Sequence, residues 1–160
     1  MDIERVWQVA AAEGARSPCS KSKRGVVVWR GDQILAWASN HPPYPFTCDG
    51  SAGCRASCGK VAVHAEQGAL LSCLESRIDV RGAEMLHTKV SLVGDSFVGV
   101  FGGPPSCPDC SKLILQSGIA GMWLIEERDG RPTPVRYTSH EFHDLTLRDC
   151  GLHPYYREKT

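Results

Sequence analysis

The chain has 160 residues, of which 42% are hydrophobic, and its acidic and basic side chains balance to a formal net charge of zero. This composition excludes a disordered or fibrous protein and predicts a single domain over residues 1–160. A long nucleic acid is an improbable partner, because binding one normally takes an excess of cations. No apolar stretch approaches the roughly 20 residues that cross a bilayer. We therefore expect a cytoplasmic protein without membrane attachment, whose eight cysteines are thiols or metal ligands.

The first part of the chain predicts a helix, a β-hairpin and a long loop. Helical spacing of apolar residues, a run of β-branched residues and a Gly-Asp turn mark the first three elements. The loop is rich in Pro, Gly and Cys, and loops of this length inside a domain are usually functional. The expected elements are a helix over 2–13 that ends at Gly14, strands over 25–30 and 33–39, and a loop over 40–59.

The second part predicts alternating helices and strands. Pro108 is expected to begin a helix and Gly118 to end it, while Ser139 is expected to cap the last helix. The expected elements are helices over 63–76, 108–117 and 139–149, strands over 85–90, 97–101 and 122–126, and a loop over 129–134. Val63, Leu70, Leu71 and Leu74 are predicted to form the inner face of the first of these helices. This alternation predicts an α/β fold, a three-layer α-β-α sandwich with a mixed central sheet of about five strands.

Two short motifs carry metal-binding side chains. His64-Ala65-Glu66 and Cys107-Pro108-Asp109-Cys110 each lie at the predicted start of a helix. One imidazole and two thiolates give three ligands for zinc and leave the fourth tetrahedral position open for water, as in catalytic zinc sites. Zinc lowers the pKa of such a water toward neutrality. Glu66, two residues from His64, can then accept the proton of the water and pass it to a ring nitrogen and a leaving amine.

A second group of cysteines lies in the long loop. Cys48, Cys54 and Cys58 are spaced so that three thiolates can reach one ion, and a closed zinc site would stabilise a loop that is costly to order. The spacing leaves the fourth ligand open between Cys19 and His41, and free thiols are the alternative. No partner is evident for the other histidines, and we expect polar surface or ordinary hydrogen bonding for them: His87, His140, His143 and His153.

Taken together, the motifs resemble those of the cytidine and deoxycytidylate deaminase superfamily, and most of all the deoxycytidylate deaminase branch. The arrangement His-x-Glu followed by Pro-Cys-x-x-Cys is typical of zinc deaminases of nucleobases. The resemblance covers residues 17 to about 126 and includes Ser17-Pro18-Cys19, the loop cysteines and His64-Ala65-Glu66-Gln67. It also includes Cys107 through Ile119, which is similar to the second zinc motif and its helix. The resemblance implies a cytidine deaminase-like fold, a catalytic zinc and hydrolytic release of ammonia.

The resemblance also implies roles for residues outside the zinc motifs. Asn40 lies where an asparagine of the family binds the sugar, and Cys19 matches a segment that supplies a ligand to a structural zinc in this branch. The family turn Gly-Tyr-Asn-Gly is here Ala38-Ser39-Asn40-His41, and the residues before the zinc cysteine are Gly103-Pro104-Pro105-Ser106 in place of Thr-His-x-Pro. The reaction class therefore transfers to this chain, whereas deoxycytidylate as the exact substrate does not.

These observations give one leading hypothesis and two alternatives. We expect deamination of a cytosine-type base in a free nucleoside or nucleotide, or of a related aminated heterocycle. The Ala65 backbone N–H is expected to hold the base carbonyl, and Tyr44 or Phe46 to wall the base. The alternatives are a base deaminase acting on RNA or single-stranded DNA and a non-catalytic module stabilised by zinc. The net charge argues against the first and Glu66 against the second.

The two ends of the chain predict self-association. The N-terminal helix carries Ile3, Val6, Trp7 and Ala10, and the C-terminal segment carries Leu145, Leu147, Leu152, Tyr155 and Tyr156. An apolar helix face that is not covered by the core needs burial elsewhere. We therefore expect a homo-oligomer that buries some of these residues, with packing on the chain's own sheet as the alternative.

Overall fold

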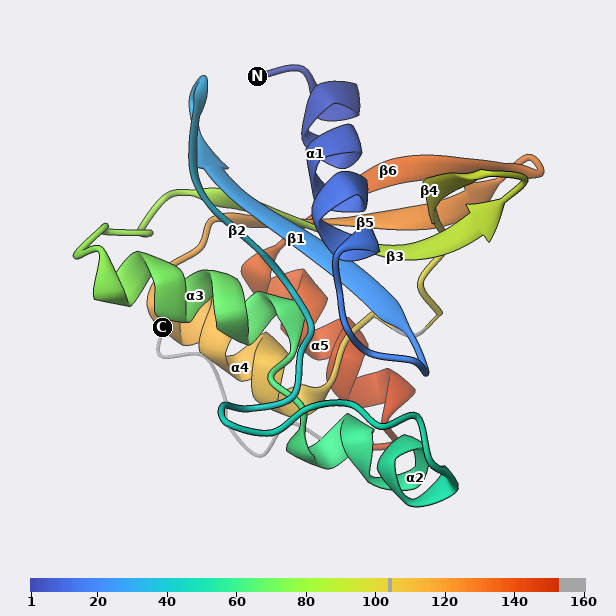
Figure 1. Ribbon diagram of the computed structural model, residues 1–160. Coiled ribbons are helices and arrows are strands. Elements are labelled where there is room, and N and C mark those ends of the chain that lie inside the picture. The colour runs from blue at the N-terminus through green and yellow to red at the C-terminus, as the bar shows by residue number, and fades with distance from the viewer. Residues whose placement is uncertain (104, 153–160) are drawn as a thin grey trace.

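The computed structural model describes residues 1–103 and 105–152, and its centre is a six-stranded mixed sheet. The strands follow the order β2-β1-β3-β5-β6, and β4 pairs with the far end of β3 (Figure 1). Only β3 and β5 run parallel, and every other pair is antiparallel. The strands are β1 Lys23–Arg30, β2 Gln33–Ser39, β3 Glu84–Val93, β4 Ser96–Val100, β5 Gly121–Arg128 and β6 Arg131–Thr138.

The helices form layers on both faces of this sheet, as the sequence predicts. Helix α1 lies on one face, and α3, α4 and α5 lie on the other, with α2 beyond the edge of these layers (Figure 1). Strand β1 contributes to both cores because its side chains alternate: Val26 and Val28 face α3 and α4, while Val27 faces α1. The helices are α1 Ile3–Ala15, α2 Ala52–Val61, α3 Ala65–Glu75, α4 Pro108–Ser117 and α5 Ser139–Asp149.

Helix α1 differs from its prediction at Gly14. The helix continues through Gly14 to Ala15, with Arg16 as its C-cap. Gly14 instead allows α1 to approach β1, because a Cβ on Gly14 would lie 2.8 Å from the backbone nitrogen of Gly25. Val6 and Ala10 are fully buried against the chain's own sheet. The N-terminal part of the predicted oligomer surface is therefore wrong for these two residues, because the sheet already covers them.

Two elements were not predicted. Helix α2 lies within the segment expected to be a loop, and Ser51 caps it by accepting a hydrogen bond from Cys54 N. Strand β6 occupies the other expected loop, although it contains Pro132 and Pro134. Prolines are tolerated there because β6 is an edge strand, where one side of the backbone needs no partner. The last helix is capped by Thr138 and not by Ser139.

The predicted inner face of α3 is correct for Leu70, which packs against the core, and wrong for two other leucines. Leu71 and Leu74 are 50% and 72% exposed. The buried residues are small or polar, because α3 packs closely on the sheet: Ala65, Glu66, Ala69 and Cys73. At the C-terminal end, Leu147 is buried and Leu152 is exposed. His153, Tyr155 and Tyr156 lie outside the described residues, as does Pro104.

No helix in the described ranges has both the length and the apolar character needed to span a bilayer.

Candidate active site

Two helix starts bring the metal-binding side chains together. His64 is the N-cap of α3, and Cys107 is the N-cap of α4, where Pro108 begins the helix with its preset backbone angle. Cys110 follows one turn later and is fully buried. Both helices are held by apolar residues that pack under the sheet, Ala69 from α3 and Ile114 from α4. The core of the fold therefore places all three ligands.

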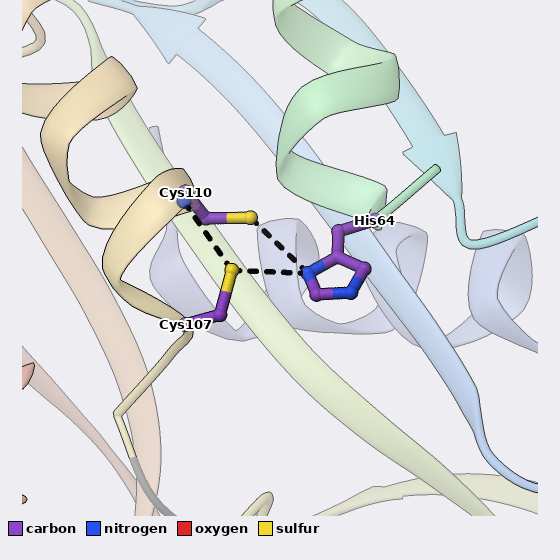
Figure 2. A group of neighbouring side chains, drawn as sticks. All are labelled: His64, Cys107 and Cys110. Carbon is purple, nitrogen blue, oxygen red and sulfur yellow. Dashed lines mark hydrogen bonds between the residues drawn. The ribbon is translucent and has the colours of Figure 1, made fainter. Parts of the chain in front are cut away.

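The three ligand atoms converge on one point. His64 Nδ1 lies 3.2 Å from Cys110 Sγ and 3.3 Å from Cys107 Sγ (Figure 2). Among the described residues this is the only group of three or more His, Cys, Asp or Glu whose ligand atoms all lie within 4.8 Å of one another. The other ring nitrogen, His64 Nε2, lies 3.3 Å from the carbonyl oxygen of Gly59. Since a carbonyl only accepts, Nε2 carries the proton and the Nδ1 lone pair faces the two sulfurs.

The electrostatics favour a thiolate at Cys107, whereas the hydrogen bond with Cys107 and burial raise the pKa of Cys110. The hydrogen bond with Cys110 lowers the pKa of Cys107 to about 4, against the opposing effect of burial. The backbone N–H of Cys110 donates to Cys107 Sγ at 3.3 Å, as expected for a thiolate at the positive end of a helix. One imidazole and two cysteines at this spacing fit zinc with an open fourth position.

Glu66 lies beside the three ligands on the first turn of α3. Its side chain is 4% exposed, and Ser106 Oγ donates a hydrogen bond to Oε1 at 2.9 Å. Burial raises the pKa of the Glu66 carboxyl, but His87, a backbone N–H and Ser106 outweigh it, and the net pKa lies below the ordinary value. A buried carboxylate held in this way can take up and release a proton without binding the metal.

A cavity of about 290 Å³ opens onto these groups. Its walls include His64, Ala65, Glu66 and Cys107 of the two motifs, and segments from β1, β3 and α2 complete it. The residues that line it include Lys21, Ser22, Arg24, Asn40, Cys58, His64, Ala65, Glu66, His87, Ser106 and Cys107. The cavity is large enough for a small organic substrate and combines one acidic side chain with two basic ones.

Comparison with known proteins decides the family. No protein-family model matches the chain. The deoxycytidylate deaminase of Mycobacterium phage D29 is 31% identical over 130 residues, which are 69% of this chain and 84% of that protein. The chain belongs to the cytidine and deoxycytidylate deaminase superfamily.

Solved structures of this superfamily share the fold. The apo dCMP deaminase of cyanophage S-TIM5 superposes with a TM-score of 0.58 at 28% identity, covering 79% of this chain and 84% of its own. The same enzyme in complex with dCMP and dUMP gives 0.60 at 27%, covering 75% and 77%. Cytidine deaminase from Burkholderia pseudomallei gives 0.59 at 17% identity, covering 89% and 96%, which shows the likeness of the fold.

The predicted substrate contacts of this deaminase divide into two groups. Asn40 and Ala65 line the cavity. The Asn40 side chain also joins two segments, since Oδ1 accepts from Arg24 N at 2.8 Å and Nδ2 donates to Ser22 O at 2.9 Å. Tyr44 and Phe46 are 95% and 71% exposed and are not among the lining residues. In the free chain these two rings therefore lie away from the cavity that they were expected to wall.

The second cysteine group is gathered but not closed. Its four members line a neighbouring apolar cavity of about 310 Å³: Cys19, Cys48, Cys54 and Cys58. Cys48 Sγ lies 3.7 Å from Cys54 Sγ, and Cys48 also bonds to Ser20. The alternative ligand, His41, does not line this cavity, and its Nδ1 lies 2.8 Å from Pro42 O.

Sequence reasoning missed three polar residues of the site. Ser106 holds Glu66, and its position directly before Cys107 was the available signal. Arg24 and His87 lie on strands whose inward side chains are otherwise apolar, such as Val26 and Met85. A polar residue at an inward position of a strand is the pattern that could have found them. The expectation that His87 lies on the polar surface or makes ordinary hydrogen bonds was therefore wrong, because this residue is buried in the wall of the site.

Proposed function

We propose that this chain hydrolyses the amino group of dCMP to give dUMP and ammonia, with one catalytic zinc. The observation that carries the proposal is the convergence of His64 Nδ1 with two cysteine sulfurs beside a buried glutamate. The named relatives support the substrate: one is a deoxycytidylate deaminase, and another was solved with dCMP and dUMP. Neither similarity by itself assigns the substrate of this chain.

His64, Cys107 and Cys110 would hold the zinc, and zinc bound there would lower the pKa of a water toward neutrality. Glu66 accepts one proton of the attacking water and delivers it to the ring nitrogen, where it stays, and then carries the second proton of that water to the amine, which departs as ammonia. Ser106 fixes the orientation of this carboxylate by occupying Oε1.

Other cavity residues bind and orient the substrate. The Ala65 backbone N–H, at the start of α3, is assigned to the base carbonyl, and Asn40 to the sugar. The cavity has two basic side chains, Lys21 and Arg24, against one acidic side chain, Glu66. This balance favours an anionic substrate, a nucleotide, over an uncharged nucleoside.

The test combines a substrate panel with a matched pair of variants. Purified protein is given dCMP, deoxycytidine, CMP and cytosine, and ammonia and the uracil product are measured. Glu66→Gln should retain zinc and lose roughly 10²- to 10⁴-fold in turnover, because an amide cannot accept the proton. Glu75→Gln, at the exposed end of α3, is the control and should behave as wild type. Wild-type turnover by Glu66→Gln would remove it from the mechanism, and zinc content without activity on any substrate would favour a non-catalytic module.

We also propose that Cys48, Cys54, Cys58 and Cys19 close around a second, structural zinc. Their common cavity and the 3.7 Å approach of Cys48 to Cys54 support this ligand set over one that includes His41. Cys48, Cys54 and Cys58 lie on α2 and its preceding loop, where no residue of α2 is buried, so they can move toward an ion held beside the buried Cys19.

A homo-oligomer stays a prediction. The burial of Val6 and Ala10 within the chain removes part of its original basis, while Leu71, Leu74 and Leu113 leave apolar surface on α3 and α4. Light scattering at micromolar concentration is the measurement. A mass that is a multiple of 17.5 kDa is expected, and the mass of one chain would contradict it.

A further inference from the structure

The wall of the site cavity beneath α3 contains two polar side chains to which the proposed reaction assigns no direct contact with the substrate. Arg24 lies on β1 and His87 on β3, and His87 is paired across the sheet with Val26. Because side chains alternate along a strand, Arg24 and Val26 share a face, and that face is the one toward α3. Both residues line the cavity, and the charge of Glu66 acts on both. They therefore lie at the reacting end of the cavity.

The imidazole of His87 is buried, and no described residue gives it a hydrogen bond. It is 5% exposed, and neither ring nitrogen makes a hydrogen bond within the described residues. Among the described residues, every side-chain nitrogen or oxygen that is closed off from solvent has a hydrogen-bond partner. Because the His87 nitrogens have none, they must be accessible from the cavity. A polar group this deeply buried normally has a partner, and one that faces a cavity is placed to find it in a ligand.

His87 also lines a second cavity, of about 500 Å³, on the side of β5 and α5. Gly102 and Gly103, which have no side chains to fill the space, also line this second cavity. A Cβ on Gly102 would lie 3.2 Å from Arg24 Nη1 and 3.7 Å from His87 Cε1. Gly102 therefore lies close to both polar groups, and His87 borders both cavities.

Arg24 likewise has donors to offer. Its Nε donates to Ser22 Oγ at 3.2 Å, and no carboxylate of the described residues lies within 4.0 Å of its guanidinium. The pair thus presents a cation with open N–H groups and an imidazole that can donate and accept. This combination recognises oxygen.

An unmodified cytosine leaves this pair without a partner. On the proposed function, the zinc ligands and Glu66 act on the aminated carbon and the neighbouring ring nitrogen, Ala65 binds the carbonyl and Asn40 the sugar. The 5′-phosphate is the part of a nucleotide farthest from the aminated carbon, whereas Arg24 and His87 lie near Glu66. The position of the base that still has no assigned protein group is C5 of the pyrimidine. It is adjacent to the aminated carbon and carries only hydrogen in cytosine.

We propose that Arg24 and His87 are specificity-determining residues that bind an oxygen-bearing substituent at C5 of the substrate base. This inference rests on the proposed function and sharpens it: the preferred substrate is a 5-substituted cytosine nucleotide, with the substituent between the two residues and the second cavity beyond. A site built to hydrogen-bond an oxygen discriminates strongly against an analogue that lacks it, because the buried polar groups are then left unpaired.

The experiment compares kcat/KM for 5-hydroxymethyl-dCMP and 5-methyl-dCMP, which differ by one oxygen. Wild type should prefer the hydroxymethyl substrate by roughly 10- to 100-fold. His87→Leu and Arg24→Met should each reduce this ratio to within about 3-fold of unity, since a hydrogen bond to oxygen is lost. His87→Gln, which keeps a donor and an acceptor, should retain part of the preference. His140→Gln on α5, a residue outside both cavities, is the control.

A binding measurement separates this inference from the reaction itself. Calorimetry on the Glu66→Gln variant compares 5-hydroxymethyl-dUMP with 5-methyl-dUMP, and the hydroxymethyl compound should bind more tightly, with the difference lost when His87→Leu is added. Absence of turnover on every cytosine substrate would defeat the proposed function, yet this binding ratio would still decide the role of Arg24 and His87. A wild-type ratio near one overturns the inference. The inference is also overturned if the two variants lose kcat/KM on dCMP but keep it on deoxycytidine. That result would place Arg24 and His87 at the phosphate instead.

Discussion

Two cysteine-bearing regions of this molecule differ in how much of their geometry the fold supplies. The site of His64, Cys107 and Cys110 is already assembled, with all ligand atoms within 4.8 Å. The group in the segment before α3 shares a cavity, but within the described residues only Cys48 and Cys54 approach each other closely, at 3.7 Å. The same ligand chemistry is thus preorganised in one region and only gathered in the other.

The difference follows from what anchors each helix. The first turn of α4 is fixed because Cys110 and Ile114 are fully buried, and α3 is fixed by Ala65 and Ala69. Helix α2 has no buried residue, and hydrogen bonds at its surface support it, including that from Cys54 N to Ser51 Oγ at the N-cap and that from Lys21 Nζ to Arg55 O. A metal bound at the first site therefore meets ligands in place, whereas a metal bound at the second would contribute to ordering the chain around it.

The sharpest way to break this comparison is to remove a ligand of the assembled site. Cys110→Ala should abolish zinc binding there and lower turnover by more than about 10³-fold, because both the activated water and its placement are lost. The fold should persist, since an alanine fits a fully buried position with a modest cavity. Elemental analysis, circular dichroism and ammonia release measure the three effects.

Cys150→Ala provides the matched control for this substitution. Cys150 is exposed just after α5 and lines neither the catalytic cavity nor the cavity of the second cysteine group, so zinc content and turnover should match wild type. Full activity in Cys110→Ala, or loss of activity in Cys150→Ala, would contradict the assignment of the catalytic ligands.

A smaller effect is expected from the residue that supports Glu66. Ser106→Ala removes the only side-chain hydrogen bond given to this carboxylate by the described residues, while leaving the zinc ligands intact. A hydrogen bond to a charged group is worth about 1.5–3 kcal/mol, so kcat should fall roughly 10- to 100-fold with zinc content unchanged. Ser106→Thr keeps the hydroxyl and should recover most of the rate. If alanine and threonine give the same rate, Ser106 does not orient Glu66.

The assembled site was largely predictable from the sequence because each ligand lies within a short motif at a helix start. Pro108 and Gly118 mark the ends of α4, and His64 begins α3 where the apolar spacing begins. Helix-capping signals of this kind depend only on residues close in the sequence, so tertiary contacts do not change them. The layered α/β architecture was predictable for the same reason.

What the sequence did not reveal depends on contacts between distant segments. Arg24 and His87 are 63 positions apart in number and meet only because β1 and β3 pair in one register. Leu71 and Leu74 look like core residues in a helical pattern, but α3 packs so closely on the sheet that its inner face takes alanines instead. Strand β6 was hidden by its prolines, whose tolerance depends on its place at the sheet edge.

The gathered cysteine group gives the smallest expected effect on activity and the clearest test of the comparison. Cys54→Ser should lower the zinc content of freshly purified protein from two ions per chain to one, and it should leave kcat within about 3-fold, because Cys54 does not line the catalytic cavity. The loss of order should be local: the melting temperature should fall by a few degrees, since about 1 kcal/mol corresponds to roughly 2–4 °C at this size, while proteolysis within residues 40–62 should increase. Ser57→Ala, on the same helix but without a ligand atom for zinc, should change none of these values. One zinc per chain in untreated wild-type protein would contradict the second site, and the four thiols would then be free cysteines lining an apolar cavity.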